Sequence, residues 1–454
     1  MAAESVILRV RLNVRHVLLL VALAILAAVV VLLGPPVAAP TAVDPSASSS
    51  SLVHRNLIPA ADPDPWSTGD WRAMEDPFAP HRAPLLRIDG LTDAGDVLIG
   101  WGRTPAQGRN QFNDMGAVFL SRDGRSWRSV PIDHGVNAAS ASELTGVAPG
   151  PLGFLAYGGV CCEPEVRAMW HSSDGTQWTR LEIGGDLDPS GIYFNAAVGT
   201  ADGWVIVGNR QDGSSGEIWA SHDGMTWDSV LVQEAGLPGL TVSDVAVTPD
   251  GLIAVGTVSG PDGTYDGAIW TSPDGREWKR GGVDDPALAG AGEAQLSHVV
   301  PFAGGIYVIG SYGSTEDRER CEQLGMATPL GMGPPGTAIS CGWGTDHQWV
   351  SADGAGWQRI DPADAAGESP IEFRVVAAGG PGLLVLGESS AAGSPDTRLF
   401  ASTDGVRWEA IDPARPIGIG VAKGLAARGR HLVAVADQFD GTRSQLLIWL
   451  GTVR

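Results

Sequence analysis

The chain has 454 residues, a formal net charge of −22 at pH 7 and 16 tryptophans. This acidity argues against nucleic acid as a partner, because a protein that binds phosphate backbones needs a basic patch. Lysine occurs only at Lys279 and Lys423, so arginine carries nearly all of the positive charge. We interpret the acidic balance as a contribution to solubility rather than as a functional signal.

Residues 1–34 carry a targeting signal. Arg9, Arg11 and Arg15 precede an uninterrupted apolar run over residues 17–33. Such a run is long enough to span a bilayer as a helix, and basic residues before it predict that the following chain lies outside the cytoplasmic membrane. We therefore expect an uncleaved signal-anchor and a single-pass protein of the cell membrane, in contact with the lipid bilayer through residues 17–33. The alternative is a signal peptide whose cleavage releases a secreted protein.

Beyond a Pro-, Ala- and Ser-rich segment at residues 35–65, which is typical of a disordered linker, the chain repeats one motif. The pattern Ser-x-Asp-Gly-x-x-Trp occurs six times. Successive tryptophans are separated by 51, 49, 51, 79 and 51 residues, and they are Trp127, Trp178, Trp227, Trp278, Trp357 and Trp408. A nearly constant period of this length predicts a repeat architecture.

Each repeat unit has the pattern of four short strands. An aromatic residue lies two positions before the motif's serine, and a glycine-flanked apolar run lies further upstream, as in LIAVG at 252–256. Strand-scale alternation that is broken by Gly and Asp-Gly indicates β-hairpins. Four strands in about 50 residues correspond to one blade of a β-propeller.

The two ends of the chain supply a further blade. Residues 444–454 have the pattern of a third strand, and WRAMEDP at 71–77 matches WEAIDP at 408–413, where a fourth strand opens. We expect the strand that begins at Trp71 to complete the last blade and to close the ring, which removes an open sheet edge. The predicted fold is therefore all-β: a seven-bladed β-propeller over residues 66–454 with an N-terminal transmembrane helix.

The motif itself has a structural explanation. Its Asp carboxylate can accept hydrogen bonds from nearby amides, and its Gly permits the positive φ of a tight turn. The pattern resembles the Asp-box (BNR repeat) of the sialidase-like superfamily, shortened by one residue between Asp and Gly. In that family the Asp-box lies on the rim, away from the ligand. The resemblance thus implies structural roles for Asp123, Asp174, Asp223, Asp274, Asp353 and Asp404.

The same resemblance offers sialidase chemistry as an alternative function. Sialidases hold the substrate carboxylate with three arginines and use a tyrosine as nucleophile. Arg87 stands where the family's Arg-Ile-Pro motif would, with Asp in place of Pro, and Arg374 and Tyr193 are the other weak catalytic candidates. A third arginine and a supporting glutamate are not assignable, so we expect no catalytic residue.

First strands line the central channel of a propeller, and an alignment of the seven units places one residue of each at the channel mouth: Asp89, Gly146, Ala196, Asp244, His298, Arg374 and Lys423. Two interpretations remain open. The charges neutralise one another in a wet channel, or they form a pocket for a small polar ligand, with Asp89, Asp244, His298, Arg374 and Lys423 as its binding residues. No identical group repeats around this ring, and no phosphate loop or zinc spacing occurs, so we expect neither a metal nor a cofactor.

Residues 313–346 lengthen the fifth unit and contain Cys321 and Cys341. A disulfide between them would close this loop in an exported protein, whereas the pairing of Cys161 and Cys162 is not decided by the sequence. The loop is either a tied excursion or a place where binding residues gather.

These features favour a non-catalytic binding or assembly module on the extracytoplasmic side of the membrane. Its partner would be a protein or glycan ligand outside the membrane. The alternative is a glycoside hydrolase of the sialidase-like type.

Overall fold

The computed structural model describes residues 72–73, 87–104, 115–132, 142–160, 166–213, 215–231, 239–260, 264–289, 292–314, 316, 319, 345–360, 371–379, 382–389, 396–411, 421–428, 431–439 and 444–452. Outside these residues lie the expected signal-anchor, the linker at 35–65, Trp71, the four cysteines and most of the loop at 313–346. In the part of the chain that is described, no helix combines the length and apolar character needed to cross a membrane.

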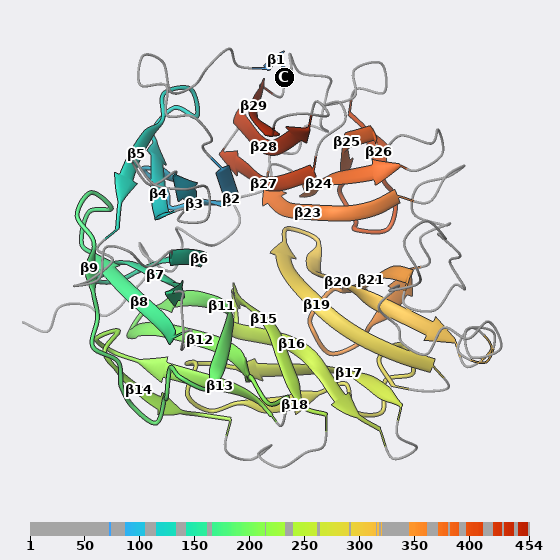
Figure 1. Ribbon diagram of the computed structural model, residues 1–454. Helices are drawn as coiled ribbons and strands as arrows, with labels where there is room; N and C mark the ends of the chain where they lie inside the picture. The colour runs from blue at the N-terminus through green and yellow to red at the C-terminus, as the bar shows by residue number, and fades with distance from the viewer. Residues whose placement is uncertain are drawn as a thin grey trace, which may run out of the picture. The chain divides into compact units, whose positions relative to one another are not determined.

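The described strands form seven sheets, which follow one another along the chain (Figure 1). Blade 1 contains β2 (Arg87–Asp93), β3 (Leu98–Thr104), β4 (Met115–Ser121) and β5 (Arg128–Pro131). Blade 2 contains β6 (Ser142–Gly150), β7 (Gly153–Val160), β8 (Val166–Ser172) and β9 (Thr179–Arg180). Blade 3 contains β11 (Ile192–Thr200), β12 (Gly203–Arg210), β13 (Gly216–Ser221) and β14 (Thr226–Ser229), with β10 (Gly184–Gly185) added at its outer edge.

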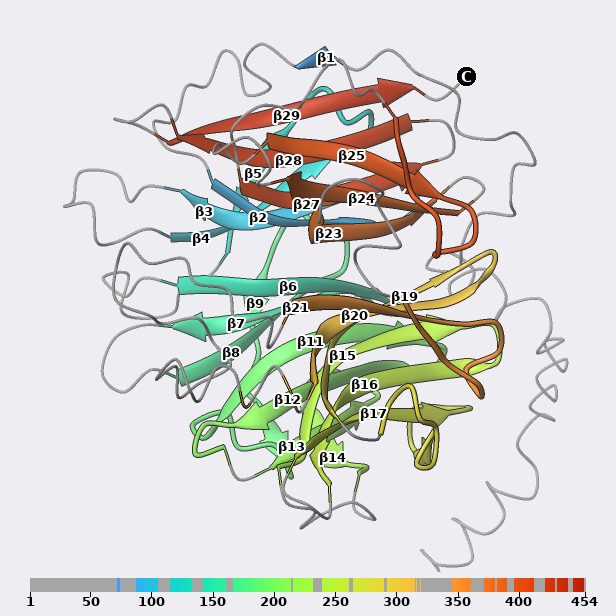
Figure 2. The ribbon, with the colours of Figure 1, turned by 90° about the vertical axis from the view of Figure 1, so that its right-hand side faces the viewer.

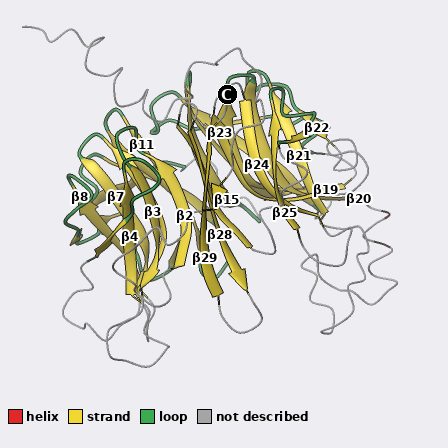
Figure 3. Ribbon diagram, turned by 90° about the horizontal axis from the view of Figure 1, so that it is seen from above, coloured by secondary structure: helices red, strands yellow, loops and turns green. Residues whose placement is uncertain are grey.

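Blade 4 contains β15 (Thr241–Thr248), β16 (Gly251–Ser259), β17 (Tyr265–Ser272) and β18 (Lys279–Gly281). Blade 5 contains β19 (Gly292–Phe302), β20 (Gly305–Ser314), β21 (Thr345–Ser351) and β22 (Gln358–Ile360). Blade 6 contains β23 (Ile371–Gly379), β24 (Gly382–Ser389), β25 (Asp396–Ser402) and β26 (Glu409–Ala410). Figure 3 shows that strands and their connecting loops account for the blades.

Blade 7 joins both ends of the chain. It contains β27 (Val421–Arg428), β28 (His431–Phe439) and β29 (Ser444–Thr452), and its fourth strand is β1 (Arg72–Ala73). Arg72 lies opposite Leu450 and Ala73 lies opposite Trp449 in an antiparallel ladder, at the outer edge of the blade (Figure 2). The strand that pairs with β29 therefore comes from the segment just after Trp71, and the last sheet is assembled from distant parts of the chain.

Seven apolar clusters close the ring. Each cluster joins two neighbouring blades, and the seventh joins blade 7 to blade 1 through residues such as Val433 and Phe119. The innermost strand of every blade also contacts the innermost strands of both neighbours. Burial of both faces of each sheet explains why the second strands are continuous apolar runs. These contacts establish an all-β, seven-bladed β-propeller.

Every innermost strand carries a β-bulge near its beginning. The ladder between the first and second strands skips one residue in each blade. The unpaired residues, which we call the bulge ring, are Asp89, Thr145, Asn195, Ser243, Ser297, Arg374 and Lys423. A bulge turns an extra residue out of the ladder and re-aims its side chain.

In six of the seven blades, a glycine of the second strand pairs with the residue just before the bulge. Gly256 pairs with Val242, the last paired residue before the bulge of blade 4. A Cβ atom at Gly256 would overlap with the carbonyl oxygen of Thr241, and glycines at the same position of four other blades have the same restriction. In blade 7 the position is Ala436 instead. The recurring glycine is thus a packing requirement.

Candidate functional site

The propeller has two ends of different character. In each blade the first and third strands run parallel, because both are antiparallel to the second. The Ser-x-Asp-Gly-x-x-Trp corner follows the third strand, so it lies at the end where the first strand finishes. The bulge ring lies near the start of the first strand, and therefore toward the opposite end of the propeller.

The corner Asp is held by the turn that it forms. In blade 3, Oδ1 of Asp223 accepts hydrogen bonds from the backbone N–H groups of Met225 and Thr226, each at 2.8 Å. The hydroxyl of Ser221 also donates to it at 3.1 Å. The Thr226 amide is the strongest influence that lowers the pKa of Asp223, and the pKa of all six corner carboxyls is shifted downward. These carboxylates therefore act as acceptors for their own backbone.

The corner Gly and Trp complete the same turn. Gly224 has φ of 77°, and the Nε1–H of Trp227 donates to its carbonyl oxygen at 3.0 Å. The indole is fully buried in the apolar cluster shared with blade 2. Five of the six corners have this Trp-to-Gly hydrogen bond, whereas Trp408 donates to Oε1 of Gln348 in the preceding blade.

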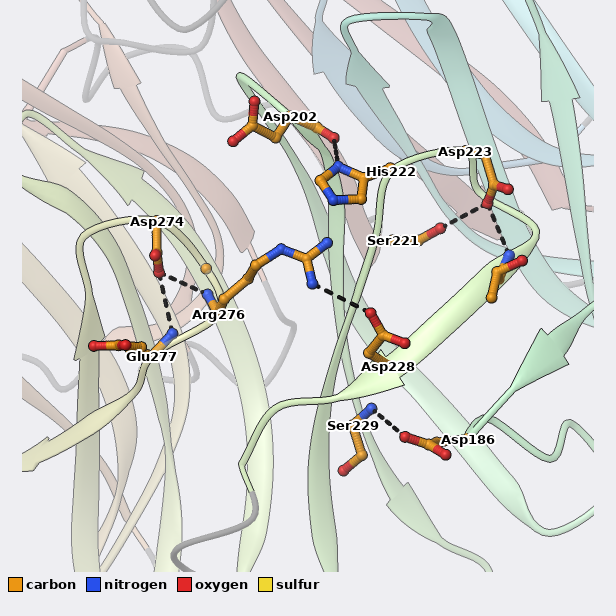
Figure 4. Close-up of polar contacts among 12 residues, drawn as sticks. Asp186, Asp202, Ser221, His222, Asp223, Asp228, Ser229, Asp274, Arg276 and Glu277 are labelled. Atoms are coloured by element: carbon orange, nitrogen blue, oxygen red, sulfur yellow. Dashed lines mark hydrogen bonds and ion pairs between the residues drawn. The ribbon is translucent and has the colours of Figure 1, made fainter.

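Figure 4 shows the corners of blades 3 and 4 side by side. Asp223 and Asp274 each turn toward their own backbone amides, and the guanidinium of Arg276 reaches Asp228 of the neighbouring blade at 3.2 Å. Both partners are substantially exposed, so such a pair contributes at most about 1 kcal/mol. One oxygen of each of these two carboxylates, Oδ1, accepts the hydrogen bonds of the turn, which favours a structural role.

The bulges change the alignment of the innermost strands. Asp89, Arg374 and Lys423, which the alignment of the units placed in one set, are all bulge residues. In blades 2 to 5 the equivalent residue lies one position earlier than Gly146, Ala196, Asp244 and His298. Periodicity alone does not reveal which residue leaves a ladder, which explains the shift. Asp244 and His298 are thus the first paired residues after their bulges.

Charged groups at the junction of blades 1 and 2 pair with one another. Nε of Arg87 lies 2.5 Å from Oδ1 of Asp89, and the guanidinium of Arg103 lies 4.0 Å from the other oxygen of Asp89. Arg103 also forms an ion pair with Glu143 of blade 2. The two arginines and two carboxylates are balanced in formal charge. This part of the bulge ring fits the interpretation of local neutralisation.

Blades 3 and 4 are connected by amide side chains. Nδ2 of Asn195, a bulge residue, donates to the carbonyl oxygen of Val242 at 2.7 Å. Oδ1 of Asn209 accepts from the N–H of the same Val242 at 2.9 Å. Both backbone groups of Val242 are therefore satisfied by the preceding blade. Asn195 consequently has a structural role in addition to its place in the bulge ring.

Asp244 and His298 meet between blades 4 and 5. Nδ1 of His298 lies 3.6 Å from Oδ2 of Asp244, which also accepts a hydrogen bond from the N–H of Val299 at 3.0 Å. The Asp244 carboxylate raises the pKa of His298 and outweighs the partial desolvation of its ring. Burial, together with the charge of Asp244, raises the pKa of the Tyr157 hydroxyl. The imidazole ring remains largely exposed, with 66% of its side-chain surface accessible.

Arg374 and Lys423 place two positive charges on neighbouring blades. Arg374 is exposed and Lys423 is partly buried. Among the residues that the structure describes, Lys423 has no hydrogen-bonded or ionic partner. An ammonium group without an acid beside it is available to an acceptor on a ligand. Lys423 is therefore the bulge-ring residue that is best placed to contact a polar ligand.

The three weak catalytic candidates lie on separate blades. Arg87 is in blade 1, Tyr193 in blade 3 and Arg374 in blade 6, and none of these blades are neighbours. Arg87 faces Asp89, whereas the guanidinium of Arg167 lies 4.4 Å from the ring centre of Tyr193. Tyr193 is 46% exposed and offers an aromatic surface. Arg87 and Tyr193 are thus each in contact with a side chain near them in the fold.

Sequence reasoning missed the neutral part of the bulge ring. Thr145, Asn195, Ser243 and Ser297 complete a set in which every member is polar. A signal was present: in all seven units, a polar residue directly follows a buried apolar residue of the first strand, as in Phe194-Asn195. Arg103, Glu143 and Arg167 were also missed, because they lie outside the positions that were aligned.

The sequence matches no protein-family model and no curated protein. Among solved structures, the chain is similar to the β-propeller domain of the Trilobed protease from Pyrococcus furiosus, at 11% identity over 80% of this chain and 96% of that one, with a TM-score of 0.45. A thermostable family-43 glycoside hydrolase has 10% identity over 58% of this chain and 89% of that one, with a TM-score of 0.31. A glycosyl hydrolase from Bacteroides ovatus has 10% identity over 55% and 82%, with a TM-score of 0.28.

Several of the similar solved structures are therefore glycoside hydrolases. At these identities and TM-scores, the similarity carries no conclusion about the chemistry of this chain. The assignment of the fold rests on the strand order and on the seven clusters between blades.

Proposed function

We propose that this protein is a non-catalytic binding or assembly module, anchored in the cell membrane through residues 17–33, whose propeller recognises a protein or glycan ligand on the extracytoplasmic side. The observation that carries the proposal is the bulge ring, where seven blades contribute seven polar side chains toward one end of the fold. Different groups from different blades suit an asymmetric polar ligand.

Several side chains in and beside the ring support binding rather than simple neutralisation. Lys423 has no partner among the described residues, and Arg374 of the adjacent blade is exposed. Ser243 and Thr145 add hydroxyl groups that can donate or accept hydrogen bonds. Tyr193 adds a half-exposed ring. Positive charge, hydroxyls and an aromatic surface are suited to a polar ligand that carries acceptor groups.

The corner motif supports the non-catalytic part of the proposal. We regard the corner as a shortened Asp-box of the sialidase-like type, and Oδ1 of its Asp accepts hydrogen bonds from the turn itself. A group that is engaged in this way by its own backbone is poorly placed to react with a substrate. The recurrence of the corner is explained by the closure of six blades.

The two lysines allow a controlled binding experiment, because they lie at different ends of the propeller. The full chain in detergent is applied to printed glycan and peptide arrays as wild type, Lys423→Glu and Lys279→Glu. We expect ligands of the wild type to be lost by Lys423→Glu, about tenfold or more in affinity, and kept by Lys279→Glu. Equal binding by the Lys423→Glu variant would remove the bulge ring from the proposal.

A glycoside hydrolase is the second candidate. The observation that favours it is the presence of two carboxylates, Asp89 and Asp244, on innermost strands, because glycoside hydrolysis uses a pair of carboxyl groups. Asp89 contacts Arg87, and Asp244 accepts hydrogen bonds from two backbone amides. Release of p-nitrophenol from a panel of p-nitrophenyl glycosides and sialosides, abolished by Asp89→Asn or Asp244→Asn, would establish the enzyme and overturn the binding module.

A further inference from the structure

The corner of blade 5 differs from the other corners in its contact with the preceding blade. A Cβ atom added to Gly275 would lie 2.7 Å from Val205 of blade 3, and one added to Gly405 would lie 3.1 Å from Val350 of blade 5. The corner glycines of blades 1, 2 and 3 likewise have apolar side chains from the preceding blade, or from the segment that follows it, within 4 Å. For Gly354, the only described atom within 4 Å belongs to Ile306 of its own blade.

The exposure of the corner glycines shows the same difference. Gly354 is partly exposed, whereas the other five corner glycines are buried. The second strands of blades 3, 4 and 5 all begin with a glycine. The residue two positions after that glycine is Val205 in blade 3, Ile253 in blade 4 and Tyr307 in blade 5, so these three residues are equivalent. Val205 and Tyr307 reach the glycine of the next corner, but Ile253 does not. Beside Gly354, the junction of blades 4 and 5 is therefore less filled by the preceding blade than the equivalent place at the other corners.

A groove of about 520 Å³ lies at this junction. Its floor contains four side chains that are at most 9% exposed: Leu252, Ile253, Phe302 and Ile306. Its walls come from the hairpins and corners of both blades, so it lies at the end opposite to the bulge ring. The groove thus has an apolar floor, and it lies away from the end where the proposed polar ligand would bind.

The charges around the groove indicate which kind of partner fits it. Asp250, Glu277 and Asp353 contribute negative charge, and Lys279 contributes one positive charge. An apolar side chain with basic neighbours complements this rim. A second copy of the chain is disfavoured, because each copy carries a formal net charge of −22.

We propose that the groove between blades 4 and 5 is an interaction site for a basic segment of another protein, which inserts one bulky aliphatic side chain beside Gly354. The inserted side chain takes the place that Val205 takes beside Gly275. Arginine or lysine on either side of it faces Asp250, Glu277 and Asp353. This site is separate from the bulge ring, and it does not depend on the function proposed for that ring.

The missing volume is tested first by filling it. Ile253→Tyr introduces the residue that the equivalent position of blade 5 has in Tyr307. We expect the thermal unfolding midpoint of this variant to equal or exceed that of the wild type. The matched control is Val205→Tyr, which enlarges a position that already contacts the next corner and should lower the midpoint by several degrees. Equal destabilisation by both substitutions would show that the groove is closed, and would overturn the proposal.

Binding is tested with a defined probe on the full chain in detergent. Reductive methylation with ¹³C-formaldehyde gives one dimethyl-lysine NMR signal for Lys279, at the groove, and one for Lys423, at the bulge ring. The probe is the capped peptide Arg-Gly-Leu-Gly-Arg, and the controls replace its Leu by Gly or its Arg residues by Glu. We expect the probe to shift the Lys279 signal and to leave the Lys423 signal unchanged.

The variants decide between the possible outcomes. Ile253→Tyr, which fills the groove, should abolish the shift, and Glu277→Lys, an exposed change, should weaken binding about tenfold without altering the unfolding midpoint. No shift of Lys279 with the probe, or an equal shift with the Gly or Glu control peptide, would overturn the proposal. A shift confined to Lys423 would also overturn it, while leaving the function proposed for the bulge ring in place.

Discussion

The corners and the bulge ring lie toward opposite ends of the same blades. Different features recur from blade to blade at the two ends. At the corners, the residue types recur together with the hydrogen bonds, from Asp123 to Asp404. In the bulge ring, the backbone irregularity recurs in every blade, whereas the side chain changes from carboxylate to hydroxyl, amide, guanidinium and ammonium. Repetition of residue type therefore marks a structural task, and variation on a repeated backbone provides a surface that can be specific.

The largest expected effect tests the structural task of the corners. Trp227→Ala removes a fully buried indole and its hydrogen bond to Gly224. We expect it to lower the free energy of unfolding by about 3–5 kcal/mol. Tyr193→Ala, a truncation of an aromatic residue near the bulge ring that is 46% exposed, should cost far less. Chemical denaturation of both variants checks the contrast, and comparable losses would contradict it.

The next effect concerns the glycine that accommodates each bulge. Gly256→Ala would bring a Cβ atom into the carbonyl oxygen of Thr241. We expect a loss of about 1–3 kcal/mol in the free energy of unfolding. Gly281→Ala is the matched control in the same blade, because no described atom lies within 4 Å of the added Cβ. A neutral Gly256→Ala variant would show that the bulge of blade 4 does not need the glycine.

A smaller effect is the pH dependence that the corner carboxylates impose. Their pKa values are lowered in the folded protein. Their contribution to stability is therefore complete above the unfolded-state pKa of about 3.9 and is lost as the pH falls through the folded-state pKa. We expect the unfolding midpoint to fall between pH 5 and about pH 3. Asp223→Asn should show a smaller fall than the wild type, and an identical pH profile would contradict the assignment.

The smallest effect lies beside the bulge ring. The pKa of His298 is raised by Asp244. The pair therefore stabilises the fold fully below the unfolded-state pKa of about 6.5, and this contribution is lost as the pH rises through the folded-state pKa. Because the imidazole is largely exposed, we expect a change of only about 0.5 kcal/mol. His298→Gln should remove it, as measured by urea unfolding at pH 6 and pH 8. If the wild type instead became more stable than the variant between pH 6 and pH 8, the prediction would be contradicted.

Most of the fold could be predicted from the sequence, but only part of the candidate site could. The corner motif is local, and its Ser, Asp, Gly and Trp satisfy one another within seven residues, so its period revealed the blades. The bulges depend on the pairing of two strands, and the residue that leaves the ladder is not visible in a period. For this reason Asp89, Arg374 and Lys423 were placed in the ring, whereas Thr145 and Ser297 were not.

Contacts between blades were also beyond the reach of sequence reasoning. Asn209 holds the amide of Val242 across a junction, and Arg103 reaches Glu143 across another. The groove beside Gly354 has no sequence signature either, because its corner has the same residue pattern as the others. Only the positions of Ile253 and Gly354 in the folded chain reveal the groove at the corner end of this junction.

One pair of variants tests directly whether the bulge ring binds the ligand and the corners stabilise the fold. The ligand is the glycan or peptide bound most strongly by the full chain on the arrays, and the two quantities are its Kd and the unfolding midpoint. Lys423→Glu should weaken binding and leave the midpoint unchanged, whereas Asp223→Asn should lower the midpoint and leave the Kd unchanged at temperatures where the protein is folded. Loss of binding in folded Asp223→Asn, together with normal binding by Lys423→Glu, would contradict the account.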